Sequence, residues 1–230
     1  MRTALVTGAS RGIGRATAVA LAEQGVQVLA VARSGDALAA LSASHAAVRP
    51  YVIDLGNADA VDTMMQALLA QGPIDILVNN AGVFPLAPIT GTAVSQFAAT
   101  IDANLVAPFR LLQAVLPHMI SRGTGHIVTI GSVADRRIFP GNGAYSASKF
   151  GARALHEVLR EEVQGTGVRA TLVAPAATDT SIWDPVDPDN TPGFPPRAAM
   201  LRPEDVADAV CWAVTRPPHV NVDELRISRS

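Results

Sequence analysis

The feature that most constrains the fold is a regular alternation of short apolar runs with longer segments of helical periodicity. Seven apolar runs have the length and composition of strands buried on both faces of a sheet, at 4–7, 26–32, 48–54, 74–79, 126–130, 168–173 and 224–227. Six helices are expected between them, at 12–24, 36–42, 59–71, 94–122, 146–165 and 203–215. The alternation predicts an α/β fold, with a parallel sheet, right-handed crossovers and helices on both faces.

Nothing in the sequence divides the chain into two domains. With 230 residues and 49% hydrophobic side chains, residues 1–230 can build one large core. The proline-rich stretch 179–196 is predicted to be a loop. Loops of this length in compact domains are often functional lids, so we expect residues 176–202 to form a substrate loop.

Composition and charge exclude several kinds of partner. A formal charge of −2 gives no reason to expect nucleic acid or an anionic membrane. Cys211 is the only cysteine and the histidines lack ligand spacing, so no disulfide within the chain and no metal site are expected. No apolar stretch is long enough to span a membrane, and the start at Met1 runs into a strand pattern without room for a signal peptide. We therefore expect a cytoplasmic protein.

A glycine-rich turn follows the first predicted strand and opens the first predicted helix. Its sequence is Thr7-Gly8-Ala9-Ser10-Arg11-Gly12-Ile13-Gly14. Glycines there permit a tight turn and let the backbone approach a pyrophosphate at the positive end of the helix. The spacing Gly-x-x-x-Gly-x-Gly differs from the usual Gly-x-Gly-x-x-Gly, and the alternative is a plain strand-to-helix turn. The context of strand and helix favours a dinucleotide site.

The end of the second predicted strand indicates which dinucleotide the chain binds. A carboxylate there would bind the adenosine ribose of NAD, but the sequence has Ala32 and then Arg33. Arg33, helped by Arg11 or Arg15, can pair with the 2′-phosphate of NADP, unless these arginines are merely solvated. Asp54, which ends the third strand, is placed to meet the adenine amino group or to cap the strand end. We expect NADP(H) to be preferred over NAD(H).

The only lysine among 18 basic residues, Lys149, lies four positions after Tyr145. On a helix this spacing puts both side chains on one face. A nearby ammonium stabilises a phenolate, which would make Tyr145 a usable proton donor near neutral pH. The alternative is a half-buried tyrosine above a surface lysine. Ser132 follows the fifth strand at the edge where open α/β sheets bind ligands, and its alternative role is a cap.

These motifs, with Asn79-Asn80-Ala81-Gly82 and Asn104 between them, resemble the classical short-chain dehydrogenase/reductase family along essentially the whole chain. The resemblance implies a doubly wound Rossmann fold whose seven parallel strands have the order 3-2-1-4-5-6-7. It also implies a homodimer or homotetramer packed through two long helices.

The resemblance further implies roles by position. Ser132 would bind the substrate oxygen, and Tyr145 would exchange its proton. Lys149 would hold the nicotinamide ribose and lower the pKa of Tyr145, and Asn104 would hold a water that links Lys149 to solvent. The expected cofactor-binding residues are Gly8, Ser10, Arg11, Gly12, Ile13, Gly14, Arg33, Asp54, Leu55, Asn80, Ala81, Gly82, Tyr145, Lys149, Pro175, Thr178 and Thr180.

Two departures from the family pattern stand out. Pro175-Ala176 replaces the usual Pro-Gly, which adds a methyl group beside the expected nicotinamide site, although Thr178 and Thr180 remain to meet the carboxamide. The C-terminal segment 223–230 lacks the Asn-Gly-Gly turn common in ketoacyl reductases of the family, and is more like members that act on small hydroxy compounds or ketones.

The expected substrate is a small carbonyl compound or alcohol. The predicted pocket wall is mostly apolar: Val133, Ala134, Ile138, Phe139, Phe84, Ala177 and Trp183. Phe84 and Trp183 could instead belong to the core or an interface. Arg136-Arg137 could recognise an acidic substrate or the phosphopantetheine arm of an acyl carrier, or could simply be solvated.

The sequence therefore predicts an NADP(H)-dependent oxidoreductase that interconverts a ketone or aldehyde and an alcohol, with Tyr145 as acid/base. A 3-oxoacyl-[acyl-carrier-protein] reductase is the alternative enzyme. A nonenzymatic NADP-binding sensor is the alternative of another class, but it would not need Ser132, Tyr145 and Lys149 together.

Overall fold

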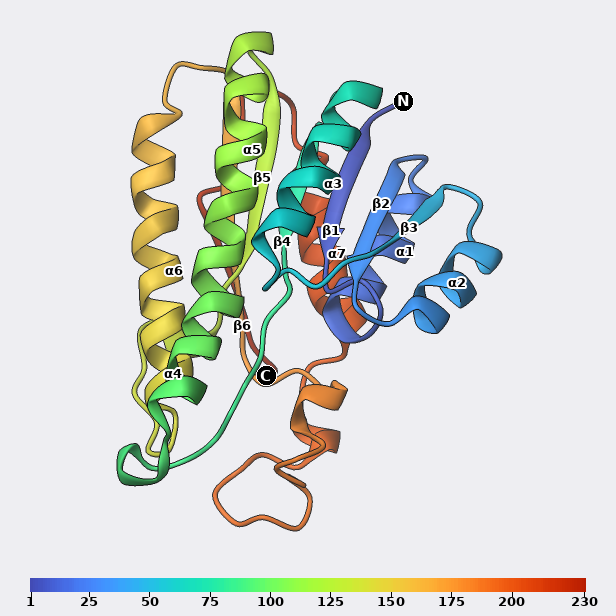
Figure 1. The fold of residues 1–230 in the computed structure, drawn as a ribbon. Helices are drawn as coiled ribbons and strands as arrows, with labels where there is room; N and C mark the ends of the chain where they lie inside the picture. The colour runs from blue at the N-terminus through green and yellow to red at the C-terminus, as the bar shows by residue number, and fades with distance from the viewer.

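The computed structural model describes residues 1–230, and its seven strands form one parallel sheet (Figure 1). The strands lie in the order β3-β2-β1-β4-β5-β6-β7, which confirms the order expected from the family resemblance. Their bounds are β1 Thr3–Thr7, β2 Gln27–Ala32, β3 Val48–Val52, β4 Ile76–Asn79, β5 Gly125–Ile130, β6 Val168–Pro175 and β7 Glu224–Ile227. Each predicted strand overlaps an observed one.

The chain has seven α-helices, and six of them cover the two faces of the sheet. Helices α1, α2 and α7 pack on one face, and α3, α5 and α6 pack on the other (Figure 1). Their bounds are α1 Gly12–Glu23, α2 Gly35–Ser44, α3 Ala58–Gln71, α4 Val94–Ile101, α5 Ala107–Arg122, α6 Gly143–Glu162 and α7 Pro203–Val214. No helix combines the length and apolar character needed to cross a lipid bilayer.

The predicted helix 94–122 is interrupted, which corrects the sequence-based assignment. A π-helical turn, Asp102–Val106, joins α4 to α5, and the amide of Ala107 donates to the carbonyl of Asp102, five residues back. Pro108 has no N–H to donate to the carbonyl of Asn104, so the α-helical ladder cannot continue there. Turns of this kind are frequent at functional sites.

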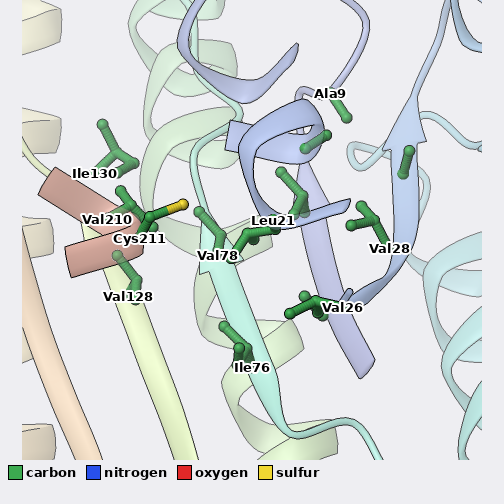
Figure 2. Packing of buried hydrophobic residues seen from close by; sticks show 14 of the residues in the cluster. Ala9, Leu21, Val26, Val28, Ile76, Val78, Val128, Ile130, Val210 and Cys211 are labelled. Carbon is green, nitrogen blue, oxygen red and sulfur yellow. The ribbon is translucent and has the colours of Figure 1, made fainter. Parts of the chain in front are cut away.

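The apolar core lies on both sides of the sheet because alternate strand residues face opposite layers. In β1, Ala4 and Val6 face the layer of α1 and α7, whereas Leu5 faces α3 and α5. Figure 2 shows the first of these layers, where Leu21 of α1 and Cys211 of α7 meet strand residues such as Val78. Cys211 is buried and its thiol is free.

Candidate active site

A cavity of about 800 Å³ opens at the carboxyl edge of the sheet. It runs from the ends of β2 and β3, at Arg33 and Asp54, past the glycine turn to Ser132 and Tyr145. Open α/β sheets bind ligands at this edge. The cavity is continuous, so a dinucleotide and a small substrate can lie end to end within it.

The glycine turn at the centre of the cavity is built for close backbone packing. Gly8 and Gly12 have φ angles of 67° and 54°, in the left-handed region that favours glycine. A Cβ atom on Gly14 would lie 2.3 Å from the carbonyl oxygen of Gly8. Ser10, Arg11 and Ile13 also line the cavity beside this turn. Because a larger residue would fill this cradle, the turn fits a pyrophosphate at the N-terminus of α1.

Thr7 joins the glycine turn to the end of β4, a role that the sequence alone does not assign. Its Oγ1 accepts hydrogen bonds from the amides of Asn80 and Ala81, at 2.9 and 3.0 Å. The Nδ2 of Asn80 donates to the carbonyl of Thr7 at 2.8 Å. Asn80, Ala81 and Gly82 consequently line the cavity as expected. The only sequence signal was a hydroxyl residue directly before the glycines.

The adenosine end of the cavity carries the predicted charged residues. Arg33 is exposed at its rim and makes no ion pair, so its guanidinium is free to bind an anion. Arg11 lines the cavity, whereas Arg15 does not. Asp54 lines it beside Leu55, and also caps the loop, since its Oδ1 accepts from the amide of Gly56 at 3.0 Å.

Helix α6 places Tyr145 and Lys149 one turn apart, as the spacing predicts. Lys149 is only 7% exposed, and its Nζ lies 5.7 Å from the centre of the Tyr145 ring. The Nζ donates to the carbonyl of Ile130 at 2.9 Å. Lys149 is therefore a buried cation beneath Tyr145, and not the surface lysine of the alternative interpretation.

Ser132 stands at the end of β5 opposite α6. Its Oγ accepts a hydrogen bond from the amide of Ala134 at 3.1 Å, so it caps the short turn Val133–Asp135. The cap uses only a lone pair and leaves the hydroxyl proton free. Ser132 thus both caps the turn and lines the cavity beside Tyr145.

Burial has opposite effects on the two titratable groups of α6. It raises the pKa of Tyr145 above its ordinary value, while the hydroxyl of Ser132 acts in the opposite direction. Burial lowers the pKa of Lys149 to about 8. Burial of the phenol is the largest influence on the Tyr145 pKa, and the expected lowering by Lys149 stays a prediction.

Asn104 lies in the π-helical turn, with both atoms of its side-chain amide engaged. Its Oδ1 accepts from the amide of Val83 at 2.8 Å, and its Nδ2 donates to the carbonyl of Val83 and to Ser148 Oγ. Ser148 Oγ in turn donates to the carbonyl of Tyr145 at 2.7 Å. Asn104 thus ties the π-helical turn to α6 through Ser148, and its expected role in holding a water stays a prediction.

An aromatic chain forms the wall next to Tyr145. The ring of Phe84 lies 4.8 Å from that of Tyr145 and 5.1 Å from that of Trp183, both edge to face. The Trp183 ring lies 6.0 Å from Phe194, and its Nε1 donates to the carbonyl of Thr178 at 3.1 Å. Phe84 and Trp183 therefore belong to the pocket.

The predicted wall needs one correction. Ile138 is 76% exposed and does not line the cavity. Apolar residues outside the predicted wall also line the cavity, among them Leu86, Ile182 and Phe194. The charged residues that line the cavity are Arg11, Arg33 and Asp54, all of which lie away from Ser132 and Tyr145.

The pair Arg136-Arg137 does not reach the cavity. The Nε of Arg136 lies 2.9 Å from Asp135 Oδ1, and its guanidinium also pairs with Glu224. The guanidinium of Arg137 lies over the ring of Phe139 at 5.5 Å. Arg136 is consequently held in ion pairs, so neither substrate recognition nor simple solvation describes it.

Ala176 fits its position without strain. Its φ is not in the left-handed region, and its amide donates to the carbonyl of Ile227 at 2.8 Å. Thr178 Oγ1 donates to the carbonyl of Ala176 at 3.0 Å. Pro175, Ala176, Thr178 and Thr180 all line the cavity, so the extra methyl leaves this edge intact.

The loop after β6 is held by Arg197. Its guanidinium lies 2.7 Å from Asp179 and 2.6 Å from Asp184. The loop extends beyond the carboxyl edge of the sheet (Figure 1), and the pair of Arg197 with Asp179 joins its two ends. The loop contributes Trp183 and Phe194 to the pocket wall.

The profile of the short chain dehydrogenase family matches residues 2–191. The chain belongs to this family. It is 39% identical, over 98% of its length, to the glycine betaine reductase ATRR of Emericella nidulans, of which it covers only 18%. Members of the family are oxidoreductases, so the chain is an oxidoreductase of the short-chain dehydrogenase family.

Solved structures of the family share the fold over almost the whole chain. A metagenomic short-chain oxidoreductase in complex with NADP is 33% identical, with a TM-score of 0.86 over 100% of this chain and 97% of that one. The closed form of a serine dehydrogenase complexed with NADP⁺ is also 33% identical, with a TM-score of 0.90 over 98% and 94% of the two chains. Both of these similar proteins have this fold and bind NADP.

Proposed function

We propose that the protein is an NADP(H)-dependent oxidoreductase that interconverts a ketone or aldehyde and an alcohol. The observation that carries this proposal is one continuous cavity with the glycine turn in its centre and Ser132 and Tyr145 at its end. Bound there, the nicotinamide would supply or accept the hydride. Every other step belongs to side chains of this chain.

In the reductive direction, the hydroxyls of Ser132 and Tyr145 donate hydrogen bonds to the carbonyl oxygen, where negative charge develops. Two preorganised donors stabilise that charge in the transition state. Tyr145 then transfers its phenolic proton to the oxygen, and Lys149 stabilises the phenolate that remains. The raised pKa of Tyr145 keeps the phenol protonated until the substrate arrives.

Preference for NADP(H) is supported by the adenosine end of the cavity. Arg33 stands free at its rim, directly after β2, where a carboxylate would serve NAD. A guanidinium can bind the 2′-phosphate through two parallel hydrogen bonds. The NADP complexes of the two similar structures agree with this preference.

The pocket wall favours a carbonyl compound with a neutral apolar substituent. The rings of Phe84, Trp183 and Phe194 form a chain that begins beside Tyr145, and no charged side chain lines this end of the cavity. Arg136 is held in ion pairs, Arg137 lies over the ring of Phe139, and neither lines the cavity, which disfavours recognition of an acyl carrier's phosphopantetheine arm and hence a 3-oxoacyl reductase.

A quaternary-ammonium aldehyde is a second candidate substrate. Aromatic rings attract such cations, and no charged side chain lines the cavity beside Tyr145, where the ammonium of Lys149 lies buried behind the ring. The similar protein from Emericella nidulans is named for glycine betaine, which is a quaternary ammonium compound.

The experiment that tests the function is the oxidation of NADPH and NADH by the purified protein, with Tyr145→Phe alongside. The panel contains benzaldehyde, trifluoroacetophenone, betaine aldehyde and an acetoacetyl thioester. Turnover of an apolar carbonyl that is lost in Tyr145→Phe would support the proposal. Tight NADPH binding without turnover of any compound would favour the nonenzymatic sensor.

We also propose that the protein assembles as a homodimer or homotetramer through α5 and α6. Phe109 on α5 is 43% exposed, and Phe150 and Val158 on α6 are 40% and 53% exposed. Exposed apolar side chains gathered on neighbouring helices are typical of protein interfaces.

A further inference from the structure

A cluster of ion pairs lies beneath the loop that carries Ser132. We define the Asp135 cluster as Asp135, Arg136, Arg153, Glu157 and Glu224. Asp135 Oδ1 lies 2.9 Å from Arg136 Nε, and Asp135 Oδ2 lies 3.9 Å from Arg153 Nη1. Arg153 Nη2 lies 3.2 Å from Glu157 and 3.3 Å from Glu224, which also pairs with Arg136. Two guanidiniums thus hold three carboxylates in one connected group.

The carboxylate of Asp135 is the most buried member of the cluster. Its side chain is 0% exposed, and its Oδ2 has no hydrogen-bond partner. A Cβ on Gly131 would lie 3.1 Å from this oxygen, so the glycine before Ser132 leaves room for the charge. Burying a charge costs free energy unless it is paired. A buried ion here therefore calls for a specific explanation.

The position of the cluster in the fold suggests that explanation. Asp135 ends the short turn that Ser132 caps, and Arg153 lies on α6 one turn beyond Lys149. Residues i and i+4 share a helix face, so Tyr145, Lys149 and Arg153 form one row. Glu224 comes from β7. The cluster consequently connects the serine loop, the catalytic helix and the edge strand.

We propose that Asp135 is a positioning residue that holds Ser132 against the catalytic face of α6 through its ion pairs with Arg136 and Arg153. The proposal rests on the proposed function, because it concerns the geometry of the two hydroxyls that bind the carbonyl oxygen. Asp135 does not line the cavity, so it acts through Ser132 and α6 and not on the substrate.

The charge of Asp135 is also felt by the catalytic pair. It raises the pKa of Tyr145, which burial raises more strongly. It also raises the pKa of Lys149, which burial lowers more strongly. The other charged groups around it are Arg136 on its own turn, Arg153, Glu157 and Arg160 on α6, and Asp223 and Glu224 at β7. His156 on α6 is neutral near pH 7, because burial lowers its pKa to about 4. Removing one charge from this nearly balanced group should shift both catalytic pKa values in a direction set by its sign.

The first test is a titration that needs no substrate. The chain has only two tyrosines, so in a Tyr51→Phe background the phenolate absorbance reports Tyr145 alone. We expect Asp135→Asn to lower the Tyr145 midpoint by at least about half a pH unit, and Arg153→Met to raise it. Asp62→Asn removes the carboxylate from a remote surface pair with Arg110 and should leave the midpoint unchanged. Equal midpoints in all variants, or shifts of one sign, would overturn the proposal.

The second test is reduction of trifluoroacetophenone by NADPH across the pH range. Asp135→Asn should lower kcat about 10-fold with little change in the KM for NADPH. The alkaline limb of its plot of kcat against pH should move to lower pH. Arg153→Met should move that limb to higher pH. A wild-type kcat in Asp135→Asn would contradict a positioning role. So would a loss of activity that is explained by a lower melting temperature and leaves the pH profile of kcat unmoved.

The two tests separate this inference from the proposed function. One outcome is that Asp135→Asn and Arg153→Met shift the Tyr145 midpoint in opposite directions while neither they nor the wild type turn over a substrate. That result would support the link between Asp135 and Tyr145 and would overturn the proposed activity on the carbonyls tested. If Asp135→Asn does not fold, Glu224→Gln removes a charge of the same sign from the same guanidiniums and should lower the Tyr145 midpoint too. An unchanged midpoint in that variant would overturn the proposal.

Discussion

The Nζ of Lys149 donates a hydrogen bond to the carbonyl oxygen of Ile130, at 2.9 Å, two residues before Ser132. This bond joins the catalytic helix to the strand that delivers the serine. The ammonium therefore has a fixed place below Tyr145 and little contact with water. Its burial, and not a neighbouring cation, is the main cause of its lowered pKa.

The pH dependence of reduction should report this burial. Because the pKa of Lys149 falls to about 8 from an ordinary 10.5, the ammonium is lost as pH rises through about 8. We expect kcat/KM for carbonyl reduction to fall through that region. The contribution of Lys149 to the free energy of unfolding changes in the opposite direction. Between its folded pKa and its ordinary pKa the unfolded chain binds more protons, so stability rises with pH. A rate profile that stays flat up to pH 10.5 would contradict the assignment of Lys149.

Tyr145→Phe should remove the proton donor while leaving the pocket intact. The phenyl ring keeps its contact with Phe84, 4.8 Å away, so the wall should not collapse. We expect turnover to fall by about 100- to 10,000-fold, the usual contribution of a general acid. NADPH affinity, measured by fluorescence titration, should change less than about threefold. Residual activity near that of the wild type would assign the proton to another group.

Most strand positions could be predicted, because buried parallel strands give short apolar runs that sequence periodicity detects, whereas the strand order came from the family resemblance. The break at Asp102–Val106 could not, since an uninterrupted apolar pattern covers both helices and only the missing N–H of Pro108 marks it. Local sequence shows the residue that breaks a helix but not how the chain accommodates the break.

The catalytic and cofactor residues could be predicted where a motif fixes their place on an element. The aromatic wall depended on where a long loop returns to the sheet, so Trp183 was recognised but Phe194 was not. The sequence does not predict the ion pair of Arg136 with Glu224, because the two residues lie 88 positions apart, on different elements. Pairing over such separations follows from the tertiary fold and leaves no local signal.

Arg33→Asp should replace a cation that attracts the 2′-phosphate of NADPH with a carboxylate that repels it. We expect NADPH affinity to fall by about 10- to 100-fold, because hydrogen bonds to charged groups contribute about 1.5–3 kcal/mol, and NADH affinity to change little. The matched control is Arg15→Asp, which alters an exposed arginine that does not line the cavity. Equal losses for both cofactors would remove Arg33 from the phosphate site.

Gly14→Ala should damage the glycine turn. The new Cβ would lie 2.3 Å from the carbonyl oxygen of Gly8, which must then move. Overpacking of this kind costs about 1–3 kcal/mol, which would lower Tm by several degrees and weaken NADPH binding. Gly35→Ala is the control, because its Cβ would make only an ordinary 3.5 Å contact with Val52. Equal melting temperatures for the two variants would show that the turn adapts.

Phe150→Glu should disrupt assembly through α5 and α6. A carboxylate placed in an apolar interface loses its hydration without gaining a partner, which is more costly than losing the contacts of the ring alone. We expect the sedimentation mass to fall to that of one 23.9 kDa chain. Ile138→Glu is the control, since Ile138 is an equally apolar, 76% exposed residue that lies on neither helix. If the wild type is already monomeric, or if both variants keep the wild-type mass, the interface lies elsewhere or does not form.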